Sequence, residues 1–136
     1  MGHASVMSAI SRYRQVGTEG AVEQADPHRL IAMLYEAALS NIAMATAHME
    51  RAEVAQKGAR ISRCIEIVGT LRASLDMNVT GGLAQRLDAL YDYAIRRLFD
   101  ANATNDAAAL AEVARLVRVI AEGWNAIAPA RMQGAA

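Results

Sequence analysis

Proline is absent from the whole stretch between Pro27 and Pro129, and this feature constrains the fold more than any other in the sequence. Proline is the strongest helix breaker, because its ring removes a backbone donor and clashes with the preceding turn. Alanine, which has the highest helix propensity, fills 30 of the 136 positions. Its small side chain also lets helices approach closely. The sequence therefore predicts an all-α protein in which long helices pack into a bundle.

Apolar residues recur at three- and four-residue spacing in four segments, which is the pattern of helices with one buried face. Asp26 can cap the first helix with its carboxylate, and Pro27 suits the first helical position. We expect helices over residues 27–51, 54–76, 81–102 and 105–128.

The ends of the later helices carry weaker signals. Thr80 is expected to cap the third helix, and Asn102 suits a left-handed position at its end. Asp106 is expected to open the fourth helix, and Pro129 to end it. Residues 50–58 lack a clear turn signal, so the boundary between the first two helices is poorly marked.

A chain of 136 residues is one domain by length. Short connections between long helices favour antiparallel neighbours, so we expect an antiparallel four-helix up-down bundle. The N-terminal arm should contain a short helix over residues 4–14, with Tyr13 on its apolar side. We divide residues 1–136 into an arm and linker at 1–25, a four-helix core at 26–128 and a flexible tail at 129–136.

Charge and hydropathy exclude several classes of protein. Fourteen basic and fourteen acidic residues cancel, whereas nucleic-acid-binding proteins usually carry a basic excess. The longest uncharged run, residues 37–49, is shorter than the about 20 apolar residues that cross a bilayer. The N-terminus shows no signal-peptide core.

Cys64 is the only cysteine and lies on an apolar stripe, which indicates a small buried side chain in a reducing cytoplasm.

The sequence contains no constellation typical of catalysis or cofactor binding. It has no Glu-x-x-His pair for a di-iron bundle, no Cys-x-x-Cys-His for haem attachment, and no glycine-rich phosphate loop. We therefore expect no catalytic residues, no metal and no cofactor. Lys57, Arg60 and Arg63 are expected to form a solvated basic face.

A histidine phosphotransfer bundle is the main alternative from another class. His48 lies late in a long helix, as the phosphorylated histidine of such proteins does. However, the lysine and glycine that usually follow that histidine are missing, and Glu50 and Glu53 would repel a phosphoryl group. A self-associating structural bundle is the second alternative.

The segment 81–102 has more apolar surface than one core contact needs. Tyr91, Ile95 and Phe99 form a second apolar ridge beside the first. A helix in a four-helix bundle turns only about three residues in seven inward, and Leu116 and Val119 extend the last helix in the same way. An apolar excess of this kind indicates either a deep core position or a docking groove. The pattern alone leaves both open.

Several short motifs, in order along residues 13–127, resemble the flagellar secretion chaperone family, FliS, whose members hold export-ready flagellin. The matching motifs are residues 27–36 with their Leu-Tyr pair, Ser74-Leu75-Asp76, Gly81-Gly82, Leu90-Tyr91-Asp92-Tyr93, Arg97-Leu98, Ala101-Asn102 and Trp124.

The resemblance implies a cytoplasmic chaperone without enzymatic activity. It would bind the disordered C-terminal region of flagellin, prevent premature polymerisation and keep flagellin competent for type III secretion, with export-gate components as further partners. From the charge balance and the hydropathy we expect no nucleic-acid partner and no direct membrane insertion, and we expect a monomer or weak dimer. The apolar face of the N-terminal arm suggests that the arm covers part of the groove until flagellin displaces it, and a frayed terminus is the alternative. The expected groove residues are Tyr13, Leu34, Tyr35, Leu90, Tyr91, Leu98, Phe99, Asn102, Leu116 and Val119.

Overall fold

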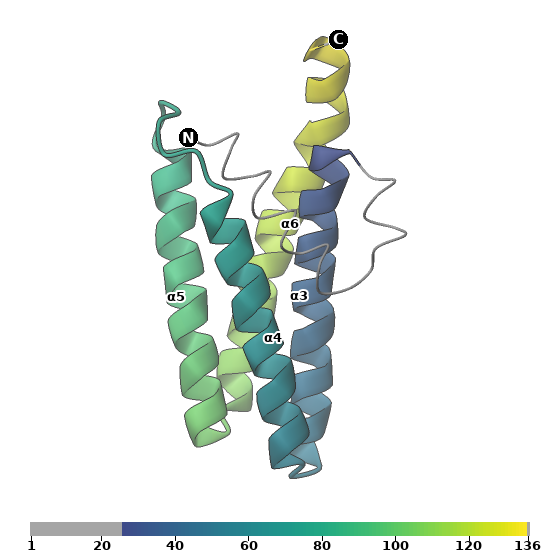
Figure 1. Ribbon diagram of the computed structural model, residues 1–136, viewed down its shortest axis with the longest axis vertical. Helices are drawn as coiled ribbons and strands as arrows, with labels where there is room; N and C mark the ends of the chain where they lie inside the picture. Colours follow the sequence, from purple (N-terminus) through teal and green to yellow (C-terminus); the bar gives the residue numbers. More distant parts are fainter. Residues whose placement is uncertain (1–25, 136) are drawn as a thin grey trace.

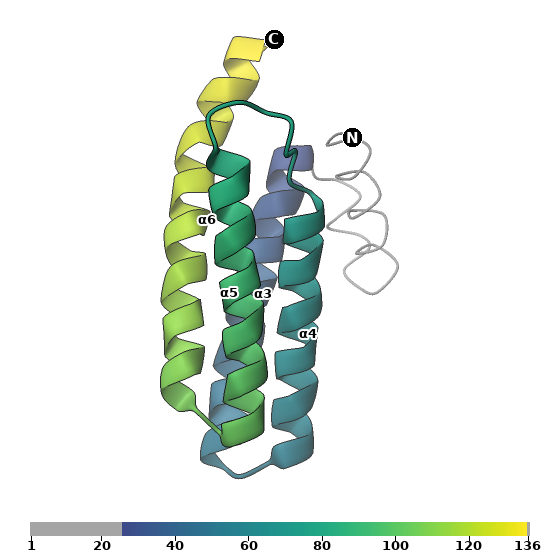
Figure 2. The same cartoon turned by 90° about the vertical axis from the view of Figure 1, so that its left-hand side faces the viewer.

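The computed structural model describes the backbone of residues 26–135 and the side chains of residues 26–127. The arm, the linker and Tyr13 lie outside the described residues. Within them, the chain forms four long helices that run up and down side by side (Figures 1 and 2). The helices are α3 (Pro27–Glu50), α4 (Val54–Ala73), α5 (Leu83–Thr104) and α6 (Ala107–Ala135). The predicted all-α, antiparallel four-helix bundle is confirmed.

The four helices pack in the cyclic order of the sequence. Helix α3 contacts α4 and α6, and α5 contacts the same two helices from the other side. The last turns of α6 project beyond the other three helices (Figure 1). Tight turns join the helices at one end of the bundle, and the longer α4–α5 connection crosses the other end (Figure 2).

Two helix starts follow the prediction. Asp26 accepts a hydrogen bond of 2.7 Å from the backbone N–H of Arg29, and Pro27 is the first residue of α3. Asp106 accepts one of 3.1 Å from the backbone N–H of Ala109 at the start of α6. Each carboxylate thereby satisfies one of the N–H groups that a helix start leaves without a partner.

Both predicted ends of α5 were wrong by a few residues. Its N-cap is Gly82 and not Thr80. Gly82 has a φ of 78°, and glycine adopts this left-handed conformation without the clash that a Cβ would cause. At the other end the left-handed residue is Asn105, with a φ of 53°, whereas Asn102 remains inside the helix.

The predicted ends of α4 and α6 were also wrong. Helix α4 ends at Ala73, three residues before the expected boundary. Helix α6 continues past Pro129 to Ala135. A proline inside a helix removes one backbone hydrogen bond at a cost of about 3 kcal/mol but keeps its carbonyl acceptor, so a helix can continue beyond it.

Helix α3 is apolar and long enough to cross a membrane, and it is the one helix within residues 26–135 that meets this test. Half of its most apolar 18-residue segment is buried inside the bundle. Leu34, Ala38 and Ile42 lie on that buried face. The core helix of a bundle has this composition because it contacts neighbours along its whole length.

The core consists mainly of aliphatic and small side chains, and it also contains the rings of Tyr35 and Tyr91. Alanine occupies several of the tightest positions, and Cys64 is fully buried among them. The Cys64 thiol donates a long hydrogen bond of 3.6 Å to the carbonyl of Ala38 on the adjacent helix. Burial raises the pKa of this thiol to about 12. The interpretation of Cys64 as a small buried side chain is confirmed.

Cys64 should be unreactive in the folded protein. At pH 8 a thiol with a pKa of about 12 is almost wholly protonated, and the thiolate is the reactive form. We expect no colour change with a disulfide thiol reagent at pH 8 until denaturant unfolds the bundle, and then one thiol per chain. Rapid labelling without denaturant would contradict the packing described.

Candidate functional site

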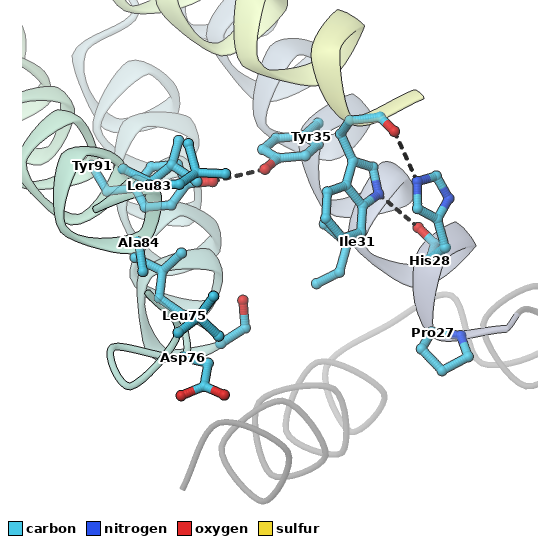
Figure 3. Close-up of a pocket in the computed structure, with 13 residues that line it drawn as sticks. Pro27, His28, Ile31, Tyr35, Leu75, Asp76, Leu83, Ala84 and Tyr91 are labelled. Atoms are coloured by element: carbon cyan, nitrogen blue, oxygen red, sulfur yellow. Dashed lines mark hydrogen bonds between the residues drawn. The ribbon is translucent and has the colours of Figure 1, made fainter. Parts of the chain in front are cut away.

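A pocket of about 610 Å³ opens at the end of the bundle where α3 and α5 begin (Figure 3). Its walls come from helices α3, α5 and α6 and from the connection between α4 and α5. Almost all of its surface is apolar. The lining residues are Pro27, His28, Ile31, Tyr35, Ser74, Leu75, Asp76, Val79, Leu83, Ala84, Leu87, Tyr91 and Trp124.

A reciprocal contact between His28 and Trp124 forms one side of the pocket (Figure 3). The His28 Nε2 donates a 2.9 Å hydrogen bond to the Trp124 carbonyl, and the Trp124 indole N–H donates one of 3.0 Å to the His28 carbonyl. The two rings stack with centroids 4.5 Å apart. This pair fixes the start of α3 against α6.

Tyr35 and Tyr91 meet deep in the pocket, with their hydroxyl oxygens 2.7 Å apart (Figure 3). Tyr35 comes from α3 and Tyr91 from α5, so the contact joins two helices across the bundle. Burial is the main cause that raises the pKa of both hydroxyls above its usual value. Both groups are therefore neutral at physiological pH.

Asp76 supplies the charge of the pocket lining. Its carboxylate accepts a 3.0 Å hydrogen bond from the backbone N–H of Asn78. Among the described residues no basic side chain forms an ion pair with it. The pocket is thus an apolar cavity with a carboxylate in the turn beside it.

Polar contacts define the sides of α5 and α6 that face each other. Arg97 donates a 2.8 Å hydrogen bond to Glu112, and the Tyr93 hydroxyl donates one of 2.6 Å to the same carboxylate. Together they hold the pKa of Glu112 below its usual value, with the Tyr93 bond as the larger cause. These contacts mark the outer edge of the α5–α6 contact.

An apolar strip continues along this edge. Leu90 precedes Arg97 by seven residues, and Val119 follows Glu112 by seven. Seven residues are close to two helical turns, and the helices are antiparallel, so Leu90 and Val119 lie at the same level on facing edges. Both are exposed, and Leu116 beside them is half-buried. We call Leu90, Leu116 and Val119 the α5–α6 seam.

The other predicted groove residues are separated from the seam. Phe99 follows Asp92 by seven residues, and Asp92 pairs with Arg72 of α4 at 3.2 Å. Phe99 is therefore exposed on the opposite edge of α5, beside α4. Leu34 and Leu98 are buried in the core. Tyr35 and Tyr91 are also buried but line the pocket.

Asn102 lies at the opposite end of the bundle from the pocket. Its carbonyl accepts a 2.9 Å hydrogen bond from the ammonium group of Lys57, which also donates to Asn105. Lys57 is only 3% exposed, so the expectation that it forms part of a solvated basic face was wrong. A free carbonyl at the end of a helix is a favourable partner for a cation.

His48 is not placed as a phosphate carrier. Its Nδ1 lies 2.7 Å from a carboxylate oxygen of Glu53, which Arg51 also contacts. The hydrogen bond with His48, and then that with Arg51, keeps the pKa of Glu53 below its usual value. A negative charge against the ring disfavours a phosphoryl group there. Within residues 26–127, no cluster of three or more His, Cys, Asp and Glu could hold a metal ion.

The family model for the flagellar protein FliS matches residues 9–131, which include the pocket and the seam. The chain belongs to the FliS family. FliS of Salmonella typhimurium, a flagellar secretion chaperone, is 45% identical over 123 residues, which cover 90% of this chain and 91% of the relative. FliSB of Pseudomonas aeruginosa is 43% identical over 121 residues, or 89% and 96% of the two chains. FliS of Bacillus subtilis is 32% identical over 120 residues, or 88% and 86%.

Membership of the FliS family confirms the resemblance that the ordered motifs indicated. It does not favour the phosphotransfer or structural alternatives. The FliS match also includes position 13. Tyr13 lies outside the described residues, so its role in the groove stays a prediction.

Leu98 and Phe99 are neighbours in the sequence with opposite environments. Leu98 is 0% exposed and Phe99 is 59% exposed. We expect Leu98→Ala to lower the free energy of unfolding by about 2–5 kcal/mol, as for other buried leucines. Phe99→Ala should change it by less than about 0.5 kcal/mol. Urea unfolding followed by circular dichroism measures both. Equal losses would mean that the edge of the core has been misplaced.

Proposed function

We propose that this chain is a cytoplasmic flagellar secretion chaperone that binds the disordered C-terminal segment of flagellin. By covering that segment it would prevent premature polymerisation and keep flagellin competent for export. Binding alone does this work, so no catalytic step is needed. The main support is that a member of the FliS family carries a large apolar pocket and an exposed apolar seam on one bundle.

The pocket and the seam can serve one continuous client. Leu83 lines the pocket and precedes Leu90 of the seam by seven residues on the same helix. Both side chains therefore lie along one edge of α5. An extended or helical client segment could fill the pocket and then follow this edge. Of the predicted groove residues, this path uses Tyr35, Tyr91, Leu90, Leu116 and Val119.

The remaining predicted residues have other relations to this path. Leu34 and Leu98 would support it from the core, Phe99 offers a separate contact on the α4 side, and Asn102 lies far from it. Tyr13 would approach from the arm.

Ordering a disordered client consumes commonly 2–5 kcal/mol or more of the contact energy, which favours reversible binding. That property suits a chaperone that must release flagellin to the export machinery. In this proposal the free chaperone is a monomer or weak dimer.

Two valines provide a matched test of the seam. Val119 is 66% exposed on the seam, and Val54 is 68% exposed at the start of α4, near the end opposite the pocket. We expect Val119→Glu to weaken binding of the flagellin C-terminal segment at least about tenfold, equivalent to about 1.4 kcal/mol. A carboxylate there must lose water against an apolar client. Val54→Glu should leave the affinity unchanged. Titration calorimetry measures both affinities.

Thermal unfolding of the two variants serves as the control, because a surface substitution should leave the stability nearly unchanged. If titration of the wild-type protein with the flagellin C-terminal segment gave no binding heat, the proposal that this segment is the client would be contradicted. Equal affinities of the two variants, with wild-type binding intact, would move the client away from the seam. A change from monomer to dimer with protein concentration, lost in Val119→Glu, would favour self-association through the seam.

A further inference from the structure

The hydroxyl pair of Tyr35 and Tyr91 contains one more donor than the structure uses. Each neutral tyrosine hydroxyl has one proton to donate and can also accept. In the 2.7 Å contact one hydroxyl donates to the other, and the second hydroxyl keeps its own proton. No other group among residues 26–127 accepts that proton.

This leftover donor is almost completely enclosed by protein. Tyr35 is 3% exposed and Tyr91 is 2% exposed, yet both line the pocket. A buried donor without an acceptor is costly, and the great majority of buried polar groups in proteins are paired. In a complex, the acceptor would come from the client group that fills the pocket, because the surrounding walls are almost wholly apolar (Figure 3).

The character of the pocket restricts that acceptor to a neutral group. A carboxylate would have to lose its water among apolar walls, which costs much more than burying an amide. It would also meet the charge of Asp76 in the pocket lining. A neutral amide oxygen accepts a hydrogen bond without either penalty.

We propose that the Tyr35–Tyr91 hydroxyl pair is a specificity element that selects a client segment presenting one neutral amide oxygen among apolar side chains. The oxygen belongs either to an Asn or Gln side chain or to a backbone carbonyl at the end of a client helix. Apolar contact supplies general affinity, and the hydroxyl pair fixes which part of the client enters the pocket. This proposal rests on the proposed function, since the client is the C-terminal segment of flagellin.

The double variant Tyr35→Phe/Tyr91→Phe tests the proposal, because it removes both hydroxyls and keeps both rings. Calorimetric titration of the full-length chain with the C-terminal peptide of the flagellin from the same genome gives the affinity. We expect a loss of about fivefold to a hundredfold, since a buried amide oxygen would lose its donor. Each single Phe variant should lose less, because the remaining hydroxyl still has a proton to donate.

Urea unfolding of the free variants separates binding from folding. The double variant should be at least as stable as wild type, because it replaces a half-satisfied polar pair by apolar rings. An affinity for the double variant within twofold of wild type would overturn the specificity element and leave the chaperone function standing. Absence of binding by wild type would overturn both.

Substitutions in the peptide identify the source of the oxygen. Each Asn is replaced by Leu and each Gln by Met, which keeps the approximate shape of the side chain. If one replacement removes the difference between wild type and the double variant, that side chain is the acceptor. If the difference survives every replacement, the acceptor is a backbone carbonyl.

Discussion

Small side chains at the contacts between helices determine the architecture of this bundle. Ala38, Ala45, Ala101 and Ala109 are fully buried, and Cys64 lies against the backbone of Ala38. Such contacts allow close approach and dense packing. They also bury little apolar area per residue, and hydrophobic stabilisation is roughly proportional to that area. The bundle therefore needs helices that stay in contact over many turns.

Three of the five Tyr, Phe and Trp rings among residues 26–127 lie where the bundle opens. Tyr35, Tyr91 and Trp124 line the same pocket, while Tyr93 and Phe99 point outward from α5. The pocket end of the bundle thus carries three aromatic rings, whereas most of the core consists of aliphatic and small residues. A rigid body with an aromatic end suits the binding of a client segment that has no structure of its own.

Sequence periodicity predicted the four helices well, because each one repeats its apolar positions over several turns. The turn after α3 was not marked, because Ala52 adopts the left-handed conformation, with a φ of 56°, where glycine is usual. Periodicity also showed that α5 has a wide apolar arc but not where its edges lie. Neighbouring helices decide that Leu98 is inside and Phe99 outside. The burial of Lys57 depends on a carbonyl 45 residues away, which no local pattern reveals.

The stacked pair of His28 and Trp124 has an optical consequence. Trp124 is the only tryptophan in the chain, and its indole forms part of the pocket lining. Tryptophan fluorescence therefore reports on the pocket alone. Its emission wavelength and intensity depend on whether water or an apolar group lies beside the indole ring. The protein carries an intrinsic fluorophore at its candidate binding site, so occupancy of the pocket can be followed in real time on the unlabelled chain.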